Sequence, residues 1–366
     1  MSNKRIVSLS YFGKRESTLI TGIAIVLMFI HHFFGFADWL LENVEWRPVA
    51  KIGDRSIEFC VAKMGWFCVH IFAFISGYVM WKQQDDYTSF RPIFLRAAKF
   101  LVCYWIICAL FWVYAAAVGD VLPSLPKMIK NLFGFALSVR SNDVCVSFAW
   151  YVRYYICLLA LAPLLLFLFS KGIRCDSVAL MLVFFFSSLY GPHPLYISTL
   201  WPLFCSAMGI LSAKYAVFER IRRGCGRTLP WWISAAGIVV VVYCRYELLK
   251  TSFLCRGMVD PVLVIFFIYF FIELFNGLRS AGLEKVVAFM GTYSMNLWFI
   301  HSIFFTGQRF LQPLLYAPRY SILVLLWGLV MCLPVAWAIS KVQRRVLSYL
   351  GINRSGIRYE KDNEMV

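Results

Sequence analysis

The chain has 366 residues, of which 61% are hydrophobic, 18% aromatic and only 15% charged, and its mean hydropathy is +0.71. This apolar share is far above that of a soluble domain, so the composition excludes an ordinary globular protein and predicts an integral membrane protein. The net charge of +17 does not indicate a nucleic-acid-binding protein, because the basic residues lie in loops rather than on one solvated face.

About ten apolar stretches, separated by short loops, have the composition of membrane helices, which need about 20 mainly apolar residues each. We therefore predict an all-α fold, a polytopic transmembrane helical bundle in a single domain over 1–366, with helices over about 18–341. The GPHP sequence at 191–194 favours a hairpin between two short spans. The predicted spans are 18–37, 59–81, 97–118, 148–169, 176–191, 195–213, 229–247, 257–275, 286–307 and 320–341.

The Lys and Arg residues predict the orientation. Most of the 36 lie in the N-terminal tail, in alternate loops such as 82–99 and 214–227, and in the C-terminal part over 341–361. The positive-inside rule then places both termini, 1–17 and 342–366, in the cytoplasm. The first apolar stretch has full spanning length and lacks a small-residue cleavage site, so we expect it to be retained as a helix.

The 12 cysteines lie mostly within apolar stretches, for example Cys103, Cys108 and Cys205. They show neither a CxxC pair nor the Cys/His spacing of a zinc site, so we expect small buried apolar side chains and no metal site. A loop disulfide of the Cys145–Cys255 type is the alternative.

Two adjacent histidines, His31 and His32, interrupt the apolar sequence GIAIVLMFIHHFFGF at 22–36. An ionisable pair at membrane depth is by default a functional-site hypothesis, and imidazole suits a general base. Adjacent helical residues point about 100° apart, so we expect one histidine to work and the other to orient it or contact a neighbouring helix. The alternative is that both only form hydrogen bonds between helices.

The depth of the pair follows from the helix rise of about 1.5 Å per residue. His31 and His32 lie roughly 20 Å from the start of the first span, in the outer half of a core about 30 Å thick. His301 lies roughly 22 Å into the ninth span, which runs in the same direction. The three histidines are thus predicted at one depth. Asp260 and Glu273 bracket the eighth span, and we expect both to be interfacial.

Four segments carry a resemblance to a known family. They are LITGIAIVLMFIHHFFGF at 19–36, VHIFAFISGYVM at 69–80, WYVRYYICLLALAPLL at 150–165 and GTYSMNLWFIHSIFF at 291–305. The chain resembles the acyltransferase-3 family of bacterial membrane proteins, especially its fucose-acetylase-like branch. The resemblance implies about ten membrane helices and transfer of an acyl group, usually acetyl from a cytoplasmic coenzyme A thioester, to a sugar hydroxyl of a surface or exported glycan.

The first helix departs from the family pattern, in which a basic residue precedes the histidine by eleven positions. Here Thr21 stands eleven positions before His32, and Ile20 before His31. Lys14 and Arg15 are the nearest substitutes, and we expect them to bind the phosphates of the coenzyme A donor. Ordinary positive-inside anchoring is the alternative.

Five further residues are candidates for substrate binding. His70, Arg153 and His301 are polar groups within the matched segments, Trp150 precedes Arg153 by one helical turn, and Asn296 lies in the GTYSMN sequence. A guanidinium beside aromatic rings suits a sugar, a carboxylate or a phosphate. Alternatively, Arg153 and Trp150 are interfacial anchors, and His70 and Asn296 form hydrogen bonds between helices.

The predicted function is membrane O-acyl transfer, with His32 or His31 as catalytic base, either by direct transfer or through a covalent acyl-histidine intermediate. Acetyl-CoA or another acyl-CoA is expected as donor substrate without a permanently bound cofactor, and a glycan or lipid-linked sugar as acceptor. The partners include membrane lipid but no nucleic acid, the expected location is the inner membrane, and the oligomeric state is open. The alternatives are a glycan transporter or flippase with the histidines as a proton relay, and a non-catalytic relative.

Overall fold

The computed structural model describes residues 11–36, 40–135, 150–189, 200–226, 228–248, 253–305 and 310–352. Within these residues the elements are helices apart from one short β-hairpin, which confirms the predicted all-α class. The predicted hairpin at 191–194, Cys145 and the side chain of Cys255 lie outside the described part of the chain.

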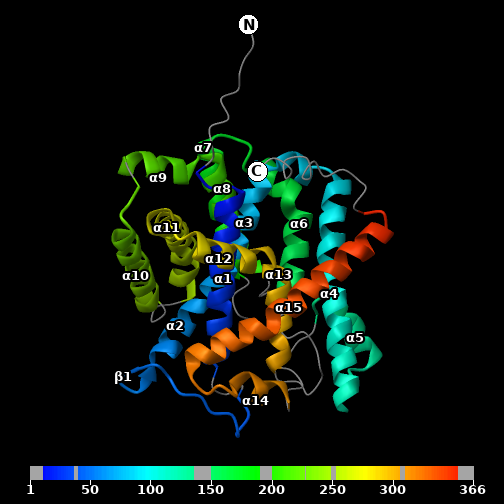
Figure 1. The fold of residues 1–366 in the computed structure, drawn as a ribbon. Coiled ribbons are helices and arrows are strands. Elements are labelled where there is room, and N and C mark those ends of the chain that lie inside the picture. The colour runs from blue at the N-terminus through cyan, green and yellow to red at the C-terminus, as the bar shows by residue number, and fades with distance from the viewer. Residues whose placement is uncertain are drawn as a thin grey trace.

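The helices and strands follow one another through the bundle shown in Figure 1. They are α1 (Lys14–Phe34), β1 (Lys51–Ile52), β2 (Arg55–Ser56), α2 (Ile57–Gly65), α3 (Phe67–Lys82), η2 (Gln84–Tyr87), α4 (Phe90–Val118), α5 (Leu125–Leu132), α6 (Trp150–Leu168), α7 (Ile173–Leu189), α8 (Leu203–Lys214), α9 (Val217–Cys225), α10 (Trp231–Leu248), α11 (Phe253–Leu278), α12 (Ala281–Thr292), α13 (Ser294–Ile300), η4 (His301–Phe305), α14 (Leu311–Tyr316) and α15 (Ser321–Tyr349).

Six helical segments of the described chain are long and apolar enough to cross a membrane, namely α1, α2 with α3, α4, α6, Val259–Leu278 of α11, and α15. They support a multi-pass membrane protein but do not confirm about ten spans. Two other expected spans are shorter, since α7 has 17 residues and α8 has 12. The span expected at 286–307 is divided into α12, α13 and η4.

Helix α1 runs through the centre of the bundle and packs against α2, α3, α12 and α13 (Figure 1). At its start the Glu16 carboxylate accepts a 2.9 Å hydrogen bond from the Gly13 amide, which satisfies one amide that the helix leaves without a partner. Apolar residues occur all around this helix, so it can be covered on several sides at once. Ile20, Ala24 and Ile25 are accordingly fully buried.

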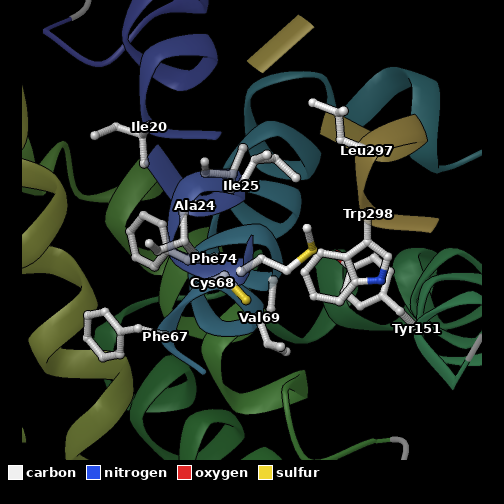
Figure 2. Packing of buried hydrophobic residues seen from close by; sticks show 14 of the residues in the cluster. Ile20, Ala24, Ile25, Phe67, Cys68, Val69, Phe74, Tyr151, Leu297 and Trp298 are labelled. Carbon is white, nitrogen blue, oxygen red and sulfur yellow. The ribbon is translucent and has the colours of Figure 1, made fainter. Parts of the chain in front are cut away.

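The core next to α1 joins side chains from α3, α6 and α13. Ile25 of α1, Val69 of α3, Tyr151 of α6 and Trp298 of α13 belong to one buried cluster (Figure 2), in which the ring centroids of Tyr151 and Trp298 lie 5.1 Å apart. On another side of α3, α8 approaches so closely that a Cβ atom at Gly77 would overlap the Ser206 backbone. Small residues at such crossings allow the backbones of membrane helices to meet.

A loop and a short helix cover the C-terminal end of α1. Trp46 of the loop after α1 packs against Phe34 with ring centroids 4.8 Å apart. The Tyr316 hydroxyl of α14 donates a 2.6 Å hydrogen bond to the Phe33 carbonyl oxygen. The end of α1 that carries the two histidines is thus held by protein on several sides.

Candidate functional site

His31 and His32 lie in the last turn of α1, and both side chains are buried. The Nδ1 atom of His31 is 2.6 Å from the Ala62 carbonyl oxygen of α2. Because a carbonyl oxygen can only accept, the ring proton lies on Nδ1, and Nε2 carries the lone pair of the neutral ring. The contact with α2 therefore sets both the orientation and the tautomer of His31.

His32 points to a different partner, His301, as expected for neighbours about 100° apart on a helix. Its Nδ1 atom lies 3.1 Å from Nε2 of His301 and 3.1 Å from the Met28 carbonyl oxygen, and Nδ1 of His301 lies 3.2 Å from the Leu297 carbonyl oxygen. The Leu297 contact places the His301 proton on Nδ1, so the Nε2 atom of His301 accepts from His32. The neutral His32 ring then carries its lone pair on Nε2. This contact agrees with the expectation that His32 and His301 lie at one depth.

A break between α2 and α3 lies beside the histidine pair. α2 ends at Gly65, and Trp66 separates it from α3, whereas the sequence predicts one continuous span over 59–81. A Cβ atom at Gly65 would overlap the His31 Cβ atom and the Leu27 carbonyl oxygen. Only glycine allows this close approach, and the broken helix meets α1 at the level of the histidines.

The break leaves carbonyl oxygens at the end of α2 that have no partner within the helix. The Ala62 oxygen accepts from His31, and the Lys63 oxygen accepts a 3.2 Å hydrogen bond from Nη1 of Arg245 in α10. Two consecutive carbonyls are thus satisfied by two side chains from different helices. Arg245 fixes the same helix end that orients His31.

Arg245 belongs to a buried cluster with Asp260 and His70. Its Nη2 atom lies 3.0 Å from Oδ2 of Asp260, and Nε2 of His70 lies 3.4 Å from the same oxygen. Asp260 is only 4% exposed, so its carboxylate faces the protein interior, and its position relative to the membrane interface stays a prediction. A carboxylate away from water needs paired charges and hydrogen bonds, which Arg245 supplies. The sequence prediction did not include Arg245. The signal that could have identified it is its position, since a charged residue within an apolar stretch of helix length is by default a functional candidate.

Aromatic rings enclose the two histidines of α1. The Phe36 ring lies 4.9 Å from His31 and stacks on His32 with centroids 6.0 Å apart. The Lys63 ammonium lies 5.7 Å from the centroid of the same Phe36 ring and donates a 3.4 Å hydrogen bond to the Gly35 carbonyl oxygen. A cation in α2 therefore lies over the ring that contacts both imidazoles, a feature that the sequence pattern did not indicate.

The structure places two further substrate-binding candidates in separate surroundings. Arg153 of α6 has its guanidinium 5.5 Å from the centroid of the Phe135 ring. Asn296 of α13 donates from Nδ2 to the Ala336 carbonyl oxygen at 2.9 Å, and its Oδ1 atom accepts from the Cys103 thiol at 2.7 Å. These bonds tie α13 to α15 and α4, and they account for the burial of Asn296 without a substrate.

Lys14 and Arg15 lie at the opposite end of α1, about 24 Å from the histidines by the helix rise. Nη2 of Arg15 forms a 2.6 Å ion pair with Glu284 of α12, and Nη1 forms a 3.1 Å pair with Glu16. To bind a phosphate of the donor, Arg15 would therefore have to give up its ion pairs with Glu284 and Glu16. Lys14 is exposed.

Tyr11 anchors the chain just before α1. Its hydroxyl donates to Glu273 of α11, and its amide donates a 3.2 Å hydrogen bond to Glu219 of α9. Burial and the Glu273 carboxylate raise the pKa of Tyr11. Glu273 is fully buried and also accepts from the Leu229 amide at 2.5 Å, and its position relative to the membrane interface likewise stays a prediction. Three donors from distant segments, including Arg222, compensate for the loss of water around this carboxylate.

Comparisons with known proteins give one positive result. A family model described as an acyltransferase domain, that of the acyltransferase-3 family, matches residues 18–341. No curated protein and no solved structure matches the chain. The matched range begins in α1 and ends in α15, so it includes the histidine pair, His70 and His301.

Proposed function

The chain belongs to the acyltransferase-3 family, and we propose that it is a membrane O-acetyltransferase acting on a surface or exported glycan. Acetyl-coenzyme A is the proposed donor, and a sugar hydroxyl is the proposed acceptor. The observation that carries the proposal is the 3.1 Å contact between His32 and His301. It supports a role for His32 as a general base, because an imidazole held in one tautomer with a lone pair on Nε2 can remove a hydroxyl proton.

The proposed reaction is direct transfer. Nε2 of His32 takes the proton of the acceptor hydroxyl, and the oxygen attacks the carbonyl carbon of the acetyl thioester. The tetrahedral intermediate collapses with loss of the coenzyme A thiolate, which takes the proton back from His32. The products are an O-acetyl ester and free coenzyme A. His301 accepts from Nδ1 of His32 throughout and keeps Nε2 directed at the acceptor.

Charge on the carbonyl oxygen of the intermediate needs a nearby cation or donor. Thr21 provides none, since its hydroxyl donates within α1 to the Thr18 carbonyl oxygen at 2.9 Å. Lys63 is the candidate that the geometry favours, because its ammonium lies over the Phe36 ring that packs on His31 and His32. Lys14 and Arg15 are then left for the phosphates of the donor at the other end of α1.

The proposal also covers the family branch, the membrane and the orientation of the chain. We place the protein in the fucose-acetylase-like branch and in a bacterial inner membrane, with both termini and the Lys14 end of α1 in the cytoplasm. The donor would then approach from the cytoplasmic side, and the acceptor would reach the histidines from the opposite side. The distribution of Lys and Arg supports this orientation.

A transporter or flippase is the second candidate. His301 contacts His32, and the His31 and His32 rings lie 4.9 Å apart, so three imidazoles form a continuous row. Such a row is suited to passing a proton, as in pumps and transporters. A third candidate, a non-catalytic relative, rests on Thr21 in place of the basic residue.

The decisive experiment uses the full-length protein in proteoliposomes. The donor is acetyl-coenzyme A labelled in the acetyl group, and the acceptor is surface polysaccharide from cells lacking this protein, with its esters removed by mild alkali. We expect alkali-labile label on the polysaccharide, and none with the His31→Ala/His32→Ala variant at equal abundance. Equal labelling by both proteins would exclude the base, and proton-coupled glycan flux without labelling would favour the transporter.

A further inference from the structure

Three tryptophans from distant parts of the chain meet beside His31. Trp66 lies at the break between α2 and α3, Trp201 precedes α8, and Trp150 begins α6. The ring centroids of Trp66 and Trp201 are 5.7 Å apart, and those of Trp201 and Trp150 are 6.0 Å apart. The Trp66 centroid lies 6.0 Å from that of His31. The result is a continuous aromatic surface that starts at the proposed catalytic site.

This surface is partly open. Trp66 is 45% exposed, and Trp150 and Trp201 are each half-buried. Tryptophans are enriched at membrane interfaces for their amphipathic character alone. An interfacial anchor, however, has no need of buried ionisable groups, and Trp201 lies edge-on to the buried His70 with centroids 4.9 Å apart. The aromatic surface therefore continues into the polar cluster.

The polar cluster behind Trp201 has unused hydrogen-bonding capacity. Asp260 and Arg245 are 4% and 3% exposed, yet among the described residues Oδ1 of Asp260 and Nε of Arg245 have no hydrogen-bond partner. Buried polar atoms are nearly always paired with protein or with bound molecules. Nδ1 of His70 likewise has no partner among the described residues, so three unpaired polar atoms lie in the cluster that His70 connects to the Trp201 ring.

A sugar ring has the chemistry that complements this arrangement. Its C–H face packs against an aromatic ring, while its hydroxyls both donate to a carboxylate and accept from a guanidinium. A phosphate would be repelled by Asp260, and an acyl chain would leave both charged groups unpaired. A mostly aromatic site with a few convergent polar groups is typical of small-molecule binding.

We propose that Trp66 and Trp201, with the cluster of Asp260 and Arg245 that His70 connects to Trp201, form a subsite for the sugar ring adjoining the one that is acetylated. The inference rests on the proposed function. It identifies the acceptor as an oligosaccharide or polymer of at least two rings, of which the reacting ring lies at His31 and His32. The subsite binds its ring without taking part in proton transfer.

The test separates binding from chemistry in Trp201→Ala and Trp201→Phe. The assay is label transfer from acetyl-coenzyme A to the deacylated polysaccharide in proteoliposomes. We expect Trp201→Ala to raise KM for the polysaccharide about tenfold or more, because the sugar ring loses its aromatic contact. The value of kcat should stay within about threefold of the wild type. Trp201→Phe retains an aromatic face and should recover most of the loss. Trp66→Ala should act in the same direction.

Trp337→Ala is the matched control, because this ring of α15 is also exposed but lies under the Lys341 ammonium at 3.6 Å. It should leave KM for the polysaccharide unchanged. An unchanged KM in Trp201→Ala, with wild-type labelling intact, would overturn the subsite alone. Equal losses in the alanine and phenylalanine variants would show that Trp201 only supports the fold. Absence of label with the wild-type protein would count against the proposed function itself.

Discussion

The two ends of α1 are stabilised by different chemistry. At the N-terminal end, charges are compensated in pairs, since Arg15 faces Glu16 and Glu284 and its side chain is 48% exposed. At the C-terminal end, His31 and His32 are buried, and their partners are a carbonyl oxygen and another imidazole. The first arrangement holds a helix in place, while the second also determines which ring nitrogen carries a lone pair. The buried histidines with neutral hydrogen-bond partners are therefore better candidates for catalytic residues than the ion-paired arginine at the other end of the helix.

The largest expected effect comes from removing the proposed base. His32→Ala should lower kcat for glycan acetylation by about 10²–10⁴-fold, the usual contribution of a general base. His301→Ala should lower it by about 10²-fold, because His301 only orients His32. Both rates are measured at saturating substrates, with membrane abundance and thermal unfolding as controls. A His32→Ala rate within threefold of the wild type would place the base elsewhere.

The second effect tests the support behind His31. Arg245→Met leaves Asp260 buried without its cation and the Lys63 carbonyl oxygen without its donor, so we expect a loss of about 3–5 kcal/mol in the free energy of unfolding. Denaturation in mild detergent measures it. The double variant Arg245→Met/Asp260→Asn should recover part of the loss, since no unpaired charge remains. A loss below about 1 kcal/mol in the single variant would show that the cluster is well hydrated.

A third variant changes only the contact between α1 and α2. The added methyl group of Gly65→Ala overlaps His31 and Leu27, which should cost about 1–3 kcal/mol of stability and lower kcat by displacing His31. Gly282→Ala is the matched control, because a methyl group added at this position of α12 would have no atom within 4 Å. The control should keep full activity. Equal behaviour of the two variants would contradict the close contact at Gly65.

The smallest effect is expected at the other end of α1. Glu284→Gln removes an exposed ion pair of Arg15 and should change the free energy of unfolding by less than about 1 kcal/mol. If Arg15 binds donor phosphate, freeing it should also lower KM for acetyl-coenzyme A, and Arg15→Gln should raise it. Initial rates over a range of donor concentrations measure both. Unchanged KM values in both variants would assign Arg15 to anchoring alone.

The apolar stretches were sufficient to predict the helical class, and they also single out His31 and His32 as candidate site residues, a role that stays a prediction. Hydropathy and the cost of imidazole in a membrane depend only on local sequence, so they are visible without a structure. The helix rise also predicted that His32 and His301 lie at one depth, and the 3.1 Å contact agrees.

The missed features depend on how helices are rotated and packed. Asp260 and Glu273 lie near helix ends, and position along the chain says nothing about whether a side chain faces water or a neighbouring helix. The break at Trp66 lies beside the contact of Gly65 with His31, which joins residues far apart in sequence. The pairing of Arg245 with Asp260 likewise appears only when α10 and α11 are placed side by side.

The contact between His32 and His301 joins residues 269 positions apart. Protein chains are synthesised at roughly 5–20 residues per second, so His32 waits on the order of 10–60 s after its own synthesis before its partner exists. During this time the His32 ring can contact the Met28 carbonyl oxygen of its own helix, but it has no imidazole partner. Products of interrupted synthesis that end before α13 therefore contain the histidine pair but lack the His301 side chain that contacts it.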